Sequence, residues 1–169
     1  MTPASSQAGS RSAPPALLTL ARAAAAGLRA RLTYRDAEGQ VSRREVEVLA
    51  LGWRWGRWAV LAHCHRRGAL RVFLLERVEE ARVGRRRSRP RSLQGVDPAE
   101  FALADLQAPD AGPVVRIPLP LPAALARLAP VLFPGAPVES GPRGPCVQLT
   151  ATDRAACGSM AASLGLAVG

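Results

Sequence analysis

The sequence predicts an α+β fold, in which a helix and a small β-barrel are followed by a smaller module with the ferredoxin-like element order βαββαβ. Three observations predict it. Short apolar runs separated by turns occupy residues 28–83, a Pro- and Gly-rich segment follows at 109–113, and a new alternation of strands and helices begins beyond it. The chain has 169 residues, of which 48% are hydrophobic. This is enough for one ordinary domain or two small ones.

The basic residues are concentrated in the first part of the chain. Through Arg91 there are 19 Arg against 7 acidic residues, whereas from Ser92 onward there are 4 against 6. A basic half joined to a mildly acidic half indicates two modules, and we expect the first to meet any anionic partner. We therefore predict a flexible tail over residues 1–15, a barrel domain over 16–108 and a C-terminal extension over 109–169.

The first part of the predicted barrel domain is a helix and two strands. Residues 16–27 are rich in strong helix formers and end at Gly27, a natural stop for a helix. Residues 28–35 alternate apolar with basic side chains, which predicts a half-buried strand with a basic outer face. A turn at 36–39 leads to residues 42–51, where Val alternates with Glu in a second strand.

Two apolar runs, Trp58–Cys64 and Leu70–Leu75, predict a β-hairpin because a short polar loop with Gly68 separates them. Five short strands around a packed interior can close into a small barrel, since closure removes the exposed edges. We expect Trp58 to lie in that core.

The register of this hairpin decides which side chains share a face. Pairing Cys64 with Leu70 places His63 opposite Arg71, with Phe73 further along on the same face, away from the core. A cationic pair with an aromatic neighbour predicts an anion-binding surface.

The C-terminal extension alternates strands and helices. Its first helix has Pro in the first turn, and Thr152-Asp153 opens its second. The predicted elements are strands at Val114–Leu119, Val138-Glu139, Cys146–Thr150 and Leu166–Val168, and helices at Pro122–Leu132 and from Thr152 to about Leu164.

The hairpin resembles the WYL domain, a small SH3-like or Sm-like β-barrel found mostly in bacterial transcription regulators. The family's Trp-Tyr-Leu strand corresponds to Trp58-Ala59-Val60-Leu61-Ala62, so that Ala59 and Val60 stand where the family has Tyr and Leu. The family's Arg-x-Phe-x-x-x-Arg-Ile pattern is matched by Arg71, Phe73, Arg77 and Val78. The resemblance extends to the upstream helix and strands, to Asp97–Phe101, and in element order to the extension that often follows WYL domains.

The resemblance implies a ligand-sensing module that binds a nucleotide-like or oligonucleotide anion. Arg suits this role because its planar fork grips a phosphate with two hydrogen bonds. Tyr34 and Phe73 are candidate stacking rings, although Tyr34 at the end of its strand also suits a packing role. The expected ligand-binding residues are Arg71, Arg77, His63, Arg44, Phe73 and Tyr34.

An Arg-rich segment follows the hairpin, and we expect it to be a Pro-containing loop. It contains Arg85, Arg86, Arg87, Arg89 and Arg91. The pattern fits a plain solvated loop, and equally a contact with the phosphate backbone of single-stranded DNA or RNA that would be sensitive to salt and blind to sequence.

Catalysis, cofactors and metals are not expected. Neighbouring residues on one strand face opposite ways, so Cys64 cannot act with an adjacent His as a nucleophile pair, and no second ligand pair accompanies His63 and His65. Three well-separated Cys do not suggest disulfides, and no phosphate-binding Gly loop is present. Neither a secretory signal nor a run long enough for a membrane span is evident, which favours a cytoplasmic protein.

The sequence thus favours a regulatory module over an enzyme. One helix before the barrel is too little for a helix-turn-helix, so we expect it to act as a homodimer or with a partner regulator. A non-specific single-stranded nucleic-acid binder is the main alternative. A scaffold that binds no ligand is a third possibility, suggested by Ala59.

Overall fold

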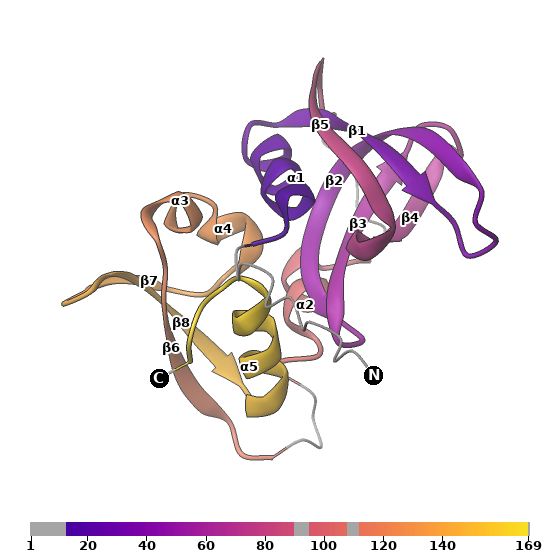
Figure 1. Ribbon diagram of the computed structural model, residues 1–169. Coiled ribbons are helices and arrows are strands. Elements are labelled where there is room, and N and C mark those ends of the chain that lie inside the picture. Colours follow the sequence, from indigo (N-terminus) through magenta and orange to yellow (C-terminus); the bar gives the residue numbers. More distant parts are fainter. Residues whose placement is uncertain (1–12, 90–94, 108–111, 169) are drawn as a thin grey trace, which may run out of the picture.

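The computed structural model describes residues 13–89, 95–107 and 112–168. It is an α+β structure with a five-stranded and a three-stranded antiparallel sheet, as the sequence predicts for the fold class (Figure 1). The helices are α1 (Pro15–Ala25), α2 (Pro98–Leu103), α3 (Ala123–Ala126), α4 (Ala129–Leu132) and α5 (Arg154–Ser163), with a 3-10 turn η1 (Leu75–Arg77). The strands are β1 (Leu28–Arg35), β2 (Val41–Arg54), β3 (Arg57–Cys64), β4 (Ala69–Leu74), β5 (Val78–Arg87), β6 (Val115–Pro120), β7 (Val138–Gly141) and β8 (Gly144–Ala151).

The five-stranded sheet has the order β4-β3-β2-β1-β5. Helix α1 packs its Leu17, Leu20, Ala21 and Ala23 face inward and ends where Gly27 adopts a φ of 63°. Gly27 suits this position because it has no Cβ to oppose a left-handed conformation. The long strand β2 therefore lies at the centre, with β1 and β5 on one side and the β3–β4 hairpin on the other.

The predicted register of the β3–β4 hairpin is wrong by one residue. Phe73 pairs with Val60, and Arg71 pairs with Ala62 rather than with His63. A slip of one residue turns every side chain of a strand to the other face. Phe73 is consequently buried in the core, whereas Val72, expected inside, is 41% exposed.

The Arg-rich segment is largely strand and not the predicted loop. Strand β5 runs through Arg87, and its partner β1 pairs Arg82 with Arg31 and Arg87 with Leu28. Backbone pairing with β1 stabilises the extended conformation of β5. Successive side chains of a strand point to opposite faces, and this separates the like charges of neighbouring Arg residues along β5. Arg91 lies outside the described residues.

The three-stranded sheet has the order β6-β8-β7 and differs from the prediction in two places. The predicted helix at 122–132 is two short helices because Pro130 lacks an N–H and its ring opposes a continuous helix. The predicted terminal strand at 166–168 does not form. Instead, the N–H of Leu166 donates to Ala161 O after Gly165 at φ 73°, a Schellman end to α5.

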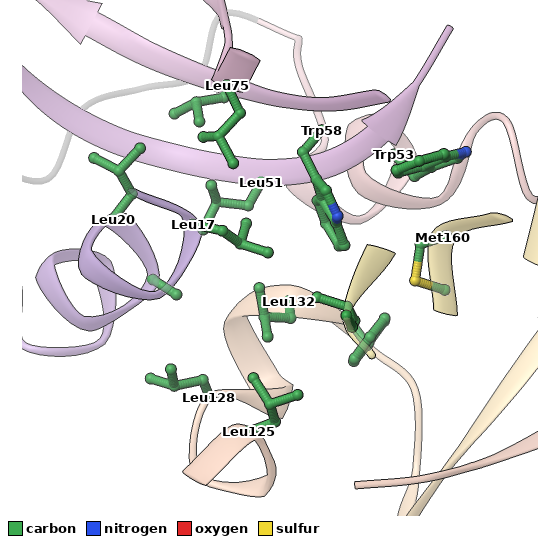
Figure 2. Close-up of a cluster of buried hydrophobic side chains, with 14 of the residues drawn as sticks. Leu17, Leu20, Leu51, Trp53, Trp58, Leu75, Leu125, Leu128, Leu132 and Met160 are labelled. Carbon is green, nitrogen blue, oxygen red and sulfur yellow. The ribbon is translucent and has the colours of Figure 1, made fainter. Parts of the chain in front are cut away.

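One continuous hydrophobic core joins the two sheets. In Figure 2, leucines of α1 and β2 face leucines of α3 and α4, with Met160 of α5 nearby. Trp58 lies in this core, as predicted, at 5% exposure, and its Nε1 donates to Ser163 Oγ at 2.8 Å. The boundary that we place near residue 108 therefore separates two sheets that share one hydrophobic core.

Candidate anion-binding site

Strand β1 lies between β2 and β5 and aligns a grid of polar side chains on one face of the sheet. Arg31 pairs with Glu45 on one side and Arg82 on the other. Thr33 pairs in the same way with Arg43 and with Glu80. Directly paired residues point to the same face. These side chains line a cleft of about 550 Å³. Its lining consists of Arg31, Thr33, Arg43, Glu45, Glu80 and Arg82, together with Leu32 and Arg44.

Four Arg and two Glu give the cleft a positive balance. Arg82 is 2.5 Å from Glu80, and Arg31 is 4.0 Å from Glu45, so each of these two Arg has a carboxylate nearby. Within the described residues neither Arg43 nor Arg44 forms an ion pair, and Arg44 Nε donates to Ser42 Oγ at 3.0 Å. The guanidinium group of Arg43, which shares the face of Thr33, is thus without a carboxylate of the described residues to neutralise it.

A charge network lies next to the cleft on the same part of the sheet. Glu47 is fully buried and accepts from His65 Nε2 at 2.8 Å. Arg29 lies 3.3 Å from Glu47 and 2.7 Å from Glu45. The backbone N–H of Arg89 also donates to Glu47, at 3.3 Å. Glu47 therefore ties the segment after β5 to the face that carries the cleft.

The hydrogen bond from Arg29 holds the pKa of Glu45 below its usual value of 4.5, and the charges of Arg86 and His65 add to this effect. A lowered pKa in the folded state means that the ionised carboxylate stabilises the fold above pH 4.5, and that this contribution is lost as pH falls through the lowered value. We expect Glu45→Gln to flatten the loss of stability on acidification below pH 4.5. Urea unfolding at a series of pH values measures this, and Glu38→Gln in the exposed 36–39 turn should leave the profile unchanged.

The predicted cationic residues lie in different places. Arg44 lines the cleft, whereas Arg71 is an exposed residue of β4 and Arg77 is a half-buried residue of η1. Neither Arg71 nor Arg77 is among the residues that line the cleft. His63 is 9% exposed, with its ring 5.2 Å from the ring of His65. The structure does not bring the predicted set together around one cavity.

The two predicted stacking rings are core residues. Tyr34 is 9% exposed and Phe73 is 5% exposed, and their rings meet edge to face at 5.0 Å. The backbone N–H of Leu74 donates to the Tyr34 hydroxyl at 3.3 Å. Neither ring face is open for a base, because the correct hairpin register turns Phe73 inward.

The sequence analysis missed Arg31, Arg43 and Arg82 as site residues. One signal was present, since the basic outer face of residues 28–35 includes Arg31. The contribution of Arg43 and Arg82 depends on which strands flank β1, and that pairing was not predicted. Arg85, Arg86 and Arg87 are exposed on β5 and Arg89 is exposed just after it.

Two of the three cysteines, Cys64 and Cys157, are buried. Cys64 is fully buried, and burial together with the charge of Asp153 raises the pKa of Cys157 to about 11.

Among residues 13–89, 95–107 and 112–168, no three His, Cys, Asp or Glu side chains gather as metal ligands would. In the same part of the chain, none of the helices combines the length and apolarity that a bilayer crossing requires.

A comparison with known protein families gives a match over the part of the chain that forms the first sheet. Residues 15–83 match the WYL domain. This part of the chain is a WYL domain. The match runs from the start of α1 into β5, so every residue that lines the basic cleft belongs to the WYL domain.

Other comparisons add little detail. Among solved structures, the chain is similar to proteasome accessory factor B/C (PafBC) of Arthrobacter aurescens, with 23% identity and a TM-score of 0.45. The similarity covers 95% of this chain but 25% of PafBC, so the chain spans about a quarter of that protein's length. No curated protein matches the chain.

Proposed function

We propose that this protein is a regulatory module, not an enzyme, and that its WYL domain binds a nucleotide-like or single-stranded nucleic-acid anion in the basic cleft. The proposed process is transcription regulation, in which WYL domains mostly occur. The observation that carries the proposal is the grid of Arg side chains on β2, β1 and β5, with Arg43 and Arg44 outside any ion pair of the described residues.

We also infer that the five strands form the SH3-like barrel expected of this family. The 3-10 turn η1 leads directly from β4, at one edge of the sheet, to β5, at the other. The bond between Leu74 N and the Tyr34 hydroxyl further supports the approach of β4 to β1. In a closed barrel the cleft would lie on the outer surface, where a nucleic-acid strand of any length can reach it.

The chemistry of the cleft suits a phosphate. Paired residues on neighbouring strands lie about 5 Å apart, so two guanidinium groups can reach the oxygens of a single phosphate. Arg31 and Arg82 form such a pair across β1 and β5. Their neighbours Glu45 and Glu80 lie within ion-pair distance of these Arg side chains and would exchange partners when an anion enters.

The test is binding of a fluorescein-labelled single-stranded oligonucleotide, measured by fluorescence anisotropy over a range of salt concentrations. We expect Arg31→Gln with Arg43→Gln to weaken binding by roughly a hundredfold, because each lost charge-assisted contact costs about 1.5 kcal/mol or more. The double variant Arg71→Gln with Arg77→Gln removes the same charge outside the cleft and should weaken binding far less. Equal losses in the two double variants would contradict the cleft as the site.

A second candidate function rests on the exposed Arg of β5. A non-specific single-stranded nucleic-acid binder would use Arg85, Arg86 and Arg87 as a basic ridge. In that case neutralising these three residues would weaken binding more than the cleft variant does. If no nucleotide or oligonucleotide binds, the scaffold alternative is favoured over both.

A further inference from the structure

The turn between β2 and β3 carries the aromatic side chain that is most exposed among the described residues. Trp55 is 57% exposed, and Arg54 and Arg57 form the last pair of the ladder beside it. Trp55 and Gly56 make the two-residue turn, with φ angles of 53° and 71°. Such turns favour Asn-Gly, and a bulky side chain is strained in this conformation. The turn itself therefore gives no reason for a Trp.

The indole is held in place by its neighbours. The Arg54 guanidinium lies 5.1 Å from the ring of Trp55 and 5.3 Å from the ring of Phe101 in α2. Asp105 binds Arg54 Nε at 3.0 Å and also accepts the backbone N–H of Trp55. Trp and Arg are both among the residue types that are enriched at the hot spots of protein interfaces.

A hollow lies beside this turn. Its volume is about 650 Å³, and Arg54 and Gly56 of the turn region form part of its wall. The opposite wall is made of small side chains: Ala104 after α2, and Ala155, Ala156 and Ser159 of α5. A turn that carries an exposed ring and borders a hollow makes a surface that can be complementary to itself. A two-fold rotation would place each ring in the hollow of the other copy.

Charge favours a second copy at this face. The chain has a net charge of +10, so two copies repel at most contact geometries. At the turn and the hollow, however, two Arg side chains stand against three acidic ones. They are Arg54, Arg57, Glu76, Asp105 and Asp153.

We propose that the protein forms a two-fold dimer in which Trp55 of each copy enters the hollow between the β2–β3 turn and α5 of the other. The basic cleft lies toward the opposite end of β2, roughly 30 Å along the strand at about 3.3 Å per residue. Dimerisation at the turn, which lies beside α2 in Figure 1, leaves that cleft open. The proposal does not depend on the ligand of the cleft.

Sedimentation equilibrium of the full chain over a range of concentrations tests the dimer. Asn tolerates the positive φ of this turn position, so Trp55→Asn removes the indole ring without straining the backbone. We expect wild type to dimerise and this variant to dimerise roughly thirtyfold more weakly or worse, the loss typical of a truncated hot-spot residue. Thermal unfolding should show Trp55→Asn to be at least as stable as wild type, since it relieves backbone strain.

A second variant tests the hollow. Ala155 is an exposed residue of α5, and Ala155→Phe should fill the hollow and prevent dimerisation without disturbing the core. Mixing it with Trp55→Asn should restore part of the association, because one ring and one open hollow remain in the mixed pair. Val72→Asn, which removes a 41% exposed hydrophobic side chain on β4, should dimerise like wild type. A monomeric wild type, or full dimerisation of Trp55→Asn, would overturn the proposal.

Discussion

Glu47→Ala should destabilise the fold by about 3 kcal/mol, because it breaks a buried ion-pair network and removes the carboxylate that Arg29 and His65 contact. The Glu47 side chain is 1% exposed and that of Arg29 is 13% exposed, with 3.3 Å between them. Arg29 retains Glu45 in the variant, which places the expected loss at the lower end for buried pairs. The His65 ring and the Arg89 N–H lose their acceptor as well.

Urea unfolding at neutral pH measures this loss, and two variants serve as controls. Glu47→Gln keeps an acceptor oxygen in the same shape and should cost less than the Ala variant. Glu80→Ala breaks an exposed ion pair with Arg82, whose side chain is 75% exposed, and should cost under about 1 kcal/mol. A Glu47→Ala protein within about 1 kcal/mol of wild type would show that the network does not stabilise the fold.

Gly52→Ala should destabilise the protein by about 1–3 kcal/mol, because α2 packs directly on the backbone of β2 at this glycine. An added Cβ would lie 2.6 Å from Ala102 Cα and 2.9 Å from Phe101 O. These are backbone atoms, so only a displacement of α2 can relieve the clash. The same displacement would disturb the stacking of Phe101 on Arg54.

The matched control is a glycine with free space around it. A Cβ at Gly158 in α5 would meet no atom within 4 Å. Gly158→Ala should therefore stabilise the protein, by up to about 1 kcal/mol, because Ala is the better helix former. Thermal unfolding of both variants compares them directly. If Gly52→Ala and Gly158→Ala shift the midpoint in the same direction, the close packing of α2 on β2 is not a constraint.

Local patterns in the sequence predicted most of the elements. Helix formers ending at Gly27 predicted α1, and alternation over residues 28–35 predicted β1 with its basic outer face. Two apolar runs around Gly68 predicted the β3–β4 hairpin, and its motifs predicted the WYL resemblance that the family match confirms. These features depend on neighbours in the chain, so they can be read from spacing alone.

The tertiary structure decided which of these residues meet. Hairpin register depends on turn geometry and burial, and a slip of one residue moved Phe73 into the core and separated Arg71 from His63. The cleft exists because β5 pairs with β1, which brings Arg82 beside Arg31 from about fifty residues away.

The sequence by itself determined the kinds of elements, the charge that favours an anionic partner and the family of the first sheet. Only the folded chain determined the site, because Arg31, Arg43 and Arg82 gather through strand pairing over long sequence distances. The joining of the two sheets in one core, seen at Trp58 and Ser163, was decided in the same way. Periodicity fixes which way a side chain points within its own strand, whereas long-range packing fixes what lies beside it.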